Sequence, residues 1–465
     1  MATTTQTVLK EPGQHELSQW THRQQEPEAS NALTSSEPQQ PESGSGQNTR
    51  LDKKTILKLI SASFSFMVAG VNDGSTGAII PYLIRDYQVS TALVSSIYAA
   101  QFAGWLFAAV SNTHLCQYLG LGSMLALGAI FQIISHALRA WMPPFGLFVT
   151  TFFLVSIGQA YNDSHANTFA ASIKGAHRWL AIIHASYMAG CLIGPFVATG
   201  VATAGSNSQW YLFYTFPTAV GCVNLALILW AFRDSMRVEP QPRAVDDTPE
   251  AQDAATEQTS KNKDAVRLIK DILSGRNVWL LGMFYFFYIG SQITMSGWMV
   301  EYLVDVRDGN LAQMGFVPAG FNGGCLLGRL LLAEPTYRLG ERHMVLIYCL
   351  LAVGLQLIFW LVPNIIAASV AVSFIGFFTG PFFATGMNMG SKLFSAESHS
   401  TALAFIFVFA QMGGSLFPII TGVIASSAGV QVLQPILTAL LVAMTVSWLL
   451  VPRPKSQPNL ELHQE

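Results

Sequence analysis

The sequence carries little charge for its length. Only 11% of its 465 residues are Asp, Glu, Lys or Arg, whereas a soluble globular domain carries roughly 25%. The formal net charge is −2, so the chain has no basic excess that would favour binding to nucleic acid. These two shortages argue against an ordinary soluble domain and against a nucleic-acid partner.

Cysteine is also scarce, and no motif of an enzyme is present. The cysteines are far apart and form no CxxC pair, so we interpret them as packing residues rather than as disulfide or metal ligands. The loops contain no HExxH, paired-histidine or nucleophile motif. We therefore expect no enzymatic activity, no metal site and no cofactor. The five cysteines are Cys116, Cys191, Cys222, Cys325 and Cys349.

What the chain has in abundance is apolar residues, which make up 51% of it. They gather in blocks of about 20 residues or more, the length that crosses a bilayer. The first fifty residues are polar, so we expect no cleavable signal peptide, and the first block would act as the membrane signal. The twelve blocks are residues 59–84, 90–110, 119–140, 145–173, 180–204, 210–232, 278–304, 313–333, 344–361, 365–390, 400–426 and 433–451.

The spacing of these blocks predicts an all-α membrane protein with twelve transmembrane helices. The tail before the first block is rich in Gln, Glu, Ser, Thr and Pro, a composition typical of disorder. The predicted parts are a disordered N-terminal tail over 1–54, a six-helix bundle over 55–232, a cytoplasmic linker over 233–276, a second six-helix bundle over 277–451 and a C-terminal tail over 452–465.

The distribution of basic residues predicts the orientation. Only three of the 25 lysines and arginines, Arg85, Arg139 and Arg307, fall in the loops that would face outward. The positive-inside rule therefore places both termini and the linker in the cytoplasm. Arg139 is expected to extend its side chain to the outer surface. We expect a monomer in the plasma membrane, with a vacuolar or other endomembrane as the alternative.

The two halves resemble each other, which predicts two six-helix pseudo-repeats. Parallel repeats of six helices enclose a solute site near the midplane between them. Small residues in these helices allow close packing and bending, so several are candidate hinges: Gly190, Gly194, Pro195, Gly414 and Pro418. The matched segments are Met188-Ala-Gly190 with Met412-Gly-Gly414, Ser75-Thr-Gly77 with Met295-Ser-Gly297, and Gly104 with Gly324.

Two carboxylates lie inside predicted membrane helices. Asp73 is near the middle of the first block, and Asp163 belongs to a polar stripe of the fourth. An ionisable group costs roughly 2.5–3.5 kcal/mol at the centre of a membrane helix, so such groups usually face the interior of the bundle. Both are candidates for proton coupling. The alternative is structural, in which a buried Asp caps a helix break or holds a neighbouring helix.

Other polar side chains at helical spacing are candidates for lining a solute cavity. A small organic solute and the lipid bilayer are the expected partners. Each candidate has a competing interpretation as a hydrogen bond between helices. The candidates are Asn72, Gln159, Asn162, Asn167, His184 and Tyr187 in the first half, and Gln292, Asn322, Asn388 and Gln411 in the second.

Several of these segments resemble the fungal branch of the fucose-permease-like family of the major facilitator superfamily. The resemblance covers residues 55–451 and implies proton-coupled symport of a sugar, with acids in helices 1 and 4. The segments are Asn72-Asp73-Gly74 leading to Ile80-Pro81-Tyr82-Leu83, Asp163-Ser-His-Ala-Asn167, His184-x-x-Tyr187-x-x-Gly190 before Gly194-Pro195, Ser391-Lys392-Leu393-Phe394, and Gly413-Gly414-Ser415-Leu416-Phe417-Pro418.

The sequence departs from that family in three places. Asp73 precedes Pro81 by eight residues, where the bacterial fucose permease has a spacing of four. His184 and Tyr187 stand where that family has Gln and Asn. The charged motif typical of the superfamily between helices 2 and 3 is absent, because residues 111–120 contain no Arg, Lys or Asp. These departures leave the substrate open.

We therefore expect a proton-driven, alternating-access transporter for a small organic solute. Symport of a sugar or similar polar solute is one hypothesis. Antiport efflux of a metabolite or toxin is the second, since the Gly190-x-x-x-Gly194-Pro195 element resembles an antiporter motif. A nutrient receptor that does not transport is the third.

Overall fold

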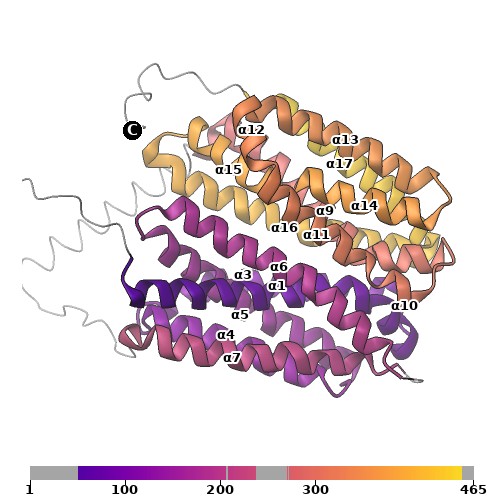
Figure 1. The fold of residues 1–465 in the computed structure, drawn as a ribbon, viewed down its shortest axis with the longest axis horizontal. Helices are drawn as coiled ribbons and strands as arrows, with labels where there is room; N and C mark the ends of the chain where they lie inside the picture. Colours follow the sequence, from indigo (N-terminus) through magenta and orange to yellow (C-terminus); the bar gives the residue numbers. More distant parts are fainter. Residues whose placement is uncertain (1–50, 206–207, 237–269, 271, 453–465) are drawn as a thin grey trace, which may run out of the picture. The chain divides into compact units, whose positions relative to one another are not determined.

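The computed structural model describes residues 51–205, 208–236, 270 and 272–452. In these ranges every regular element is a helix. The predicted N-terminal tail, most of the linker and the C-terminal tail lie outside the described residues. Leu51–Glu465 form one compact unit, within which the helices before the linker gather in the lower part of Figure 1 and those after it in the upper part.

The first half consists of long helices that run back and forth. Its elements are α1 (Lys53–Tyr87), α2 (Thr91–Val94), α3 (Ser96–Leu115), α4 (Leu121–Arg139), α5 (Phe145–Ala171), α6 (Ala176–Ala202), η1 (Trp210–Tyr214), α7 (Thr215–Ala231) and η2 (Arg233–Ser235).

The second half repeats this pattern. Its elements are α9 (Arg276–Asp305), α10 (Leu311–Met314), α11 (Val317–Leu331), α12 (Ala333–Leu339), α13 (Glu341–Leu361), α14 (Ile365–Thr379), α15 (Phe382–Leu393), α16 (Ala396–Ala428), η3 (Val430–Val432) and α17 (Leu433–Leu450). We call the end at which α1 begins and α17 ends the terminal end, and the opposite end the distal end.

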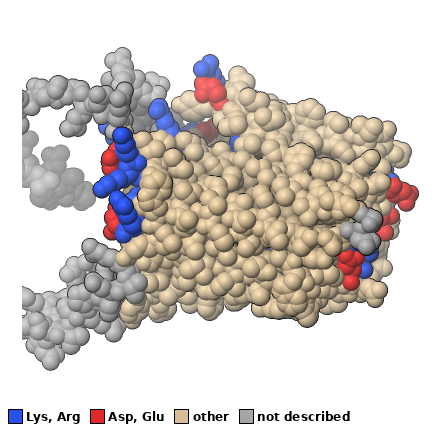
Figure 2. Space-filling model, turned by 60° about the horizontal axis from the view of Figure 1, so that its bottom comes forward, with Lys and Arg blue, Asp and Glu red and all other residues tan. Residues whose placement is uncertain are grey.

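The helices are long and apolar enough to cross a bilayer. Eleven spans qualify in the described ranges, and a twelfth is formed if the pair Leu311–Leu331 and Ala333–Leu339, bent by 50°, counts as one. On the face shown in Figure 2, charged side chains leave a broad uncharged band between them. The structure thus confirms the predicted all-α fold with twelve membrane helices in two repeats.

Close backbone contacts repeat between the halves in the same register. A Cβ added to Gly104 of α3 would strike the carbonyl oxygen of Phe153 on α5. In the second half a Cβ on Gly324 of α11 would strike that of Ser373 on α14. Both members of the second pair lie 220 positions after their counterparts. The match therefore extends from sequence to packing geometry.

Helices α1 and α6 approach each other through glycines spaced four residues apart. A Cβ on Gly190 or Gly194 of α6 would meet the backbone of α1, and a Cβ on Gly70 or Gly74 of α1 would meet the backbone of α6. Small residues at this spacing allow helices in a membrane to pack closely. The candidate hinges Gly190 and Gly194 thus have a packing role, and bending at them stays a prediction.

Three predicted helices differ in detail from the structure. Residues 90–110 begin with a separate short turn, α2, capped by Ser90, whose hydroxyl accepts from the Leu93 amide. Residues 365–390 are interrupted at Gly380 and Pro381, so that α14 and α15 are separate. The block 313–333 is divided among α10, α11 and α12. Hydropathy averages over about one span and so misses single turns.

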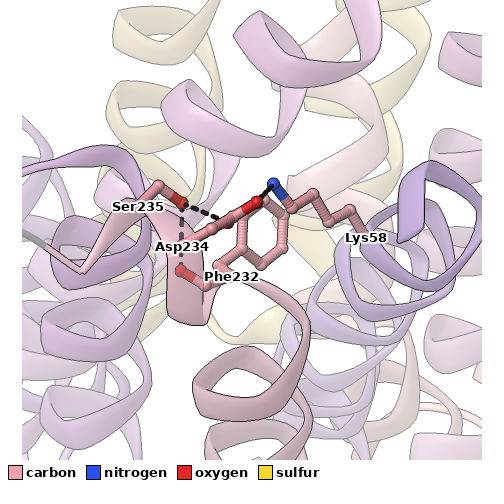
Figure 3. Close-up of polar contacts among 4 residues, drawn as sticks. All are labelled: Lys58, Phe232, Asp234 and Ser235. Atoms are coloured by element: carbon pink, nitrogen blue, oxygen red, sulfur yellow. Dashed lines mark hydrogen bonds and ion pairs between the residues drawn. The ribbon is translucent and has the colours of Figure 1, made fainter.

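A contact at the terminal end joins the first and last helices of the first half. Lys58 of α1 forms an ion pair with Asp234 of η2 at 2.7 Å, and its ammonium lies 5.5 Å from the centre of the Phe232 ring (Figure 3). The hydrogen bond from Lys58 holds the pKa of the exposed Asp234 below its usual value. Exposed pairs of this kind contribute little stability.

Contacts between the halves gather toward the distal end. The Thr91 hydroxyl donates to the carbonyl of Gly422 at 2.8 Å. A Cβ on Gly77 of α1 would meet the carbonyl of Ser296 on α9, and Tyr98 lies 6.4 Å from Trp298, ring centre to ring centre. Two long helices of opposite halves thus touch at backbone level there.

Candidate functional site

Asp73 lies at the centre of a polar cluster inside the first half. Its carboxylate accepts hydrogen bonds from Gln159 of α5 at 3.0 Å, from Asn72 at 2.9 Å and from the Tyr187 hydroxyl of α6 at 2.9 Å. Three helices therefore converge on one carboxylate. Asp73 and Tyr187 remain partly exposed, whereas Asn72 and Gln159 are buried.

Arg139 stands directly behind this cluster, and the predicted extension to the outer surface is wrong. Its side chain is 0% exposed. It donates to Asn72 Oδ1 at 2.9 Å and to the Thr151 hydroxyl at 2.6 Å, and its guanidinium lies 3.6 Å from the centre of the Phe152 ring. A charge-assisted hydrogen bond and the face of an aromatic ring offset the cost of burying this charge. A purely apolar pocket would not offset that cost. A predicted helix boundary does not reveal such partners on a neighbouring helix.

Asn72 connects the two charges. It donates through Nδ2 to Asp73 and accepts through Oδ1 from Arg139. An amide can do both because its oxygen accepts while its NH₂ donates. Asp73, Asn72 and Arg139 thus form a chain of carboxylate, amide and guanidinium, partly exposed at Asp73 and buried at the other two, which we call the Asp73 relay.

Asp163 lies on α5 one helical turn from Gln159, on the same side of the helix. It is partly exposed, and its Oδ1 is buried with no hydrogen-bond partner among the described residues. Its neighbour Asn162 is 1% exposed and packs against Gly128 of α4. Asn167 is partly exposed nearer the end of α5.

His184 reaches from the first half toward the second. Its ring lies 5.2 Å from Phe66 of α1 and 5.3 Å from Phe383 of α15, ring centre to ring centre. It lies eight residues inside α6 rather than at its end. The tilted contact of its ring with Phe383 makes His184 a contact between the two halves.

The polar candidates of the second half separate. Gln292 of α9 donates to the Thr379 hydroxyl at 3.2 Å, and Asn322 of α11 donates to the carbonyl of Cys191 in the first half at 3.0 Å. Asn388 lies instead near the terminal end, where it donates to Glu341. Gln411 is partly exposed on α16. Of the four, Asn322 therefore contacts the first half directly.

Pro195 and Pro418 are both inside long helices, α6 and α16. The carbonyl of Pro418 accepts from the Trp298 indole at 3.1 Å. Gly414 packs against Ile289 and Ile293 of α9. Pro418 and Gly414 thus contribute to the α9–α16 contact, the counterpart of α1 with α6.

One charged residue near the interface was not among the sequence candidates. Arg329 of α11 donates through Nε to the carbonyl of Gly380 at 3.2 Å, and its guanidinium lies 5.7 Å from the centre of the Phe383 ring. The sequence did contain a sign of its importance, because a charged residue inside the predicted apolar block 313–333 is unusual. Its rotation toward the interface is a property of the packing.

The segment that lacks the charged motif is held differently. In the described part of the chain His165 of α5 contacts Asn112 Oδ1 at 3.0 Å, and Cys116 Sγ lies 3.7 Å from the same His165 ring nitrogen. Burial raises the pKa of Cys116. Neutral contacts therefore tie the α3–α4 connection to α5.

Comparisons with known proteins agree with this architecture. The family model described as Major Facilitator Superfamily matches residues 62–369 and 309–465. A protein of the yeast Saccharomyces cerevisiae, called Bypass of stop codon protein 6, is 26% identical over 418 residues, which cover 85% of this chain and 82% of that protein.

Solved structures share the fold. A D-xylose–proton symporter has a TM-score of 0.66 at 14% identity, covering 87% of this chain and 100% of that one. A transporter named FucP, solved in the outward conformation, has a TM-score of 0.59 at 15% identity, covering 86% of this chain and 100% of that one. At these identities the likeness extends to the fold alone.

Proposed function

Because the chain belongs to the Major Facilitator Superfamily, and is thus a transporter rather than an enzyme, we propose that it couples a proton gradient to the movement of a small polar organic solute. In this proposal the two halves rock about a site between them. In it the terminal end also faces the cytoplasm, as the positive-inside rule predicts from the distribution of lysines and arginines along the sequence.

The observation that carries the proposal is the pair of carboxylates inside the membrane spans. Ionisable groups at this depth are costly and usually mark ion or substrate pathways. Asp73 and Asp163 are both partly exposed and come from helices that meet at Gln159. Helices that form only a structural core would not need either charge.

The two carboxylates have different surroundings, which suggests a division of roles. Asp73 has three donors and the Asp73 relay behind it, the environment that an ionised carboxylate requires. Asp163 Oδ1 has no donor in the described ranges. An unpaired carboxyl group in an apolar setting favours the neutral form. We therefore assign proton carriage to Asp163 and organisation of the site to Asp73.

The coupling cycle follows from this assignment. A proton bound to Asp163 removes a charge that would oppose passage of the site through a water-free intermediate. The proton leaves when the site opens to the cytoplasm and water can solvate the carboxylate. The contacts of the halves toward the distal end, such as Thr91 with Gly422, support an arrangement open at the terminal end.

Neutral polar groups of both halves support the solute class. Asn167 in the first half and Gln292 and Gln411 in the second are partly exposed amides, and amides suit hydroxyl-bearing ligands because they both donate and accept. The fucose-permease-like resemblance and the D-xylose–proton symporter among the structural neighbours support a sugar or a similar polar solute. Export in exchange for protons is the alternative.

The test is pH-dependent uptake in a transporter-deficient host over a panel of labelled sugars and small metabolites. Wild type is compared with Asp163→Asn and Asp73→Asn, each checked for expression at the membrane. We expect uptake to rise as external pH falls. Asp163→Asn should abolish accumulation while preserving exchange of labelled for unlabelled solute, because exchange needs no net proton release. Asp73→Asn should impair both.

Each alternative has a distinct outcome. Accumulation by Asp163→Asn equal to wild type would make Asp163 structural. Reduced cellular retention of a metabolite, with no uptake, would identify export. Uptake that does not change with external pH would exclude coupling of that uptake to protons.

A further inference from the structure

Arg329 lies where the two halves face each other. It belongs to α11, two residues before that helix ends. Its guanidinium is 5.7 Å from the Phe383 ring centre, and the same ring is 5.3 Å from His184 of the first half. Phe383 is in turn held by its carbonyl, which accepts from the Tyr285 hydroxyl at 2.6 Å. A positive charge therefore stands beside the ring that joins the halves.

Part of the guanidinium has a structural partner. The Gly380 carbonyl falls at the interruption between α14 and α15, and Arg329 Nε donates to it at 3.2 Å. Arginine has five N–H donors in a fixed fork, so this bond leaves the two Nη groups for other partners. Tyr288 of α9 also interacts with Arg329 through its hydroxyl.

No carboxylate of the described residues forms an ion pair with Arg329. The ion pairs there join Lys58 to Asp234, Arg85 to Asp86, Arg338 to Glu334 and Lys392 to Glu341. Arg329 is partly exposed and lies inside the transmembrane region, where a cation normally has a counter-charge. Among the described residues no carboxylate supplies that counter-charge.

The first half carries the opposite charge. Asp73 and Asp163 are partly exposed on α1 and α5. The second half thus carries a cation and the first half carries carboxylates. Arg329 can balance one negative charge on a solute, whereas a second negative charge would be left unbalanced and repelled by the carboxylates.

We propose that Arg329 binds the carboxylate of a singly charged, hydroxyl-bearing organic acid, so that the solute is a small hydroxylated monocarboxylate rather than a neutral sugar. The inference rests on the proposed transport function and deepens it. A guanidinium matches a carboxylate with two parallel hydrogen bonds. The Nη groups that the bond to Gly380 leaves are the donors for that carboxylate.

The experiment measures ligand-induced thermal stabilisation of the purified full-length protein in detergent. The probes are two hydroxylated acids, D-gluconate and D-glucuronate, with their uncharged counterparts D-sorbitol and D-glucose. We expect a dose-dependent rise in Tm with at least one acid and none with its neutral counterpart. Arg329→Gln should weaken the apparent affinity about tenfold to a hundredfold, the loss expected for hydrogen bonds to a charged group.

Two control variants separate binding from folding. Arg329→Lys keeps the charge and loses the fork, so it should retain part of the stabilisation. Arg338→Gln removes an exposed arginine at the terminal end, paired with Glu334 at 2.5 Å, and should bind as wild type. The Tm of each variant without ligand measures any structural loss from the freed Gly380 carbonyl.

Two results would overturn the proposal: stabilisation by the neutral counterparts that persists in Arg329→Gln, or stabilisation by neither acid. Neither result bears on proton coupling, because binding is measured without a gradient. Loss of pH-dependent uptake in the wild type would instead contradict the proposed function while leaving the anion site standing.

Discussion

Arg139 carries a positive charge into the interior of the first half, where its neighbours are mostly apolar. It is held by Asn72, Thr151 and the face of Phe152 rather than by direct contact with a carboxylate. Breaking a buried charged network by removing one partner is strongly destabilising, by about 3–5 kcal/mol for a direct ion pair. The Asn72 amide is hydrogen-bonded to both Arg139 and Asp73. We therefore expect removal of either charged group to change the stability contributed by the other.

A double-mutant cycle tests this relay. Arg139→Gln and Asp73→Asn should each lower the free energy of unfolding in detergent. The double variant should lose less than the sum, with a coupling of about 0.5–3 kcal/mol. Thermal or denaturant unfolding measures all four proteins. Additive losses would mean that Asn72 does not transmit the interaction. The control is the same cycle with Asp163→Asn in place of Asp73→Asn.

At the scale of the helix, the contact of α1 with α6 depends on the absence of side chains. A Cβ on Gly194 would lie 2.5 Å from the Val71 carbonyl oxygen and 3.1 Å from the Ser75 nitrogen. Gly200 lies on the same helix with nothing within 4 Å of its added Cβ. Substitution of Gly194 therefore tests packing between the helices, whereas substitution of Gly200 tests helix propensity alone.

We expect Gly194→Ala to destabilise the protein by about 1–3 kcal/mol, because the helices must move apart to accept the methyl group. Gly200→Ala should be neutral or stabilising by up to about 1 kcal/mol, since alanine is the better helix former. Thermal unfolding in detergent and expression level measure both. Equal effects of the two variants would show that the close approach of α1 and α6 is not required.

The two halves as whole bodies meet toward the distal end, and transport by rocking requires this contact to open. Thr199 of α6 and Gly315 before α11 lie on opposite halves there. A Cβ on Gly315 would be 3.2 Å from the Thr199 Cβ, close to the separation of about 3.5–4.5 Å in a disulfide.

A disulfide between Thr199→Cys and Gly315→Cys should therefore hold the distal end closed. We expect the oxidised double variant to lose uptake, and reduction with dithiothreitol to restore it. Each single variant serves as a control for oxidation of the native cysteines. Transport that continues at the wild-type rate with the cross-link formed would exclude opening between these two positions.

The sequence by itself determined the fold and much of the chemistry of the first half. Apolar blocks of bilayer length specify helices, because a backbone in lipid must satisfy its own hydrogen bonds. Matching glycines specify the repeat, because both halves pack the same surfaces. Helical spacing also pointed to Asp73, Gln159 and Tyr187, which the structure brings into contact.

Only the tertiary structure decided which charges meet. Periodicity assigns a residue to a face of its own helix, but not to the neighbour that the face contacts or to a depth in the membrane. Arg139 lies in the interior rather than at the surface because α4 and α5 enclose it. Arg329 lies beside Phe383, whose ring contacts His184 of the first half, and Asn388 lies near the terminal end, where it donates to Glu341. Helix tilt and rotation are set by packing against other helices, which no single segment encodes.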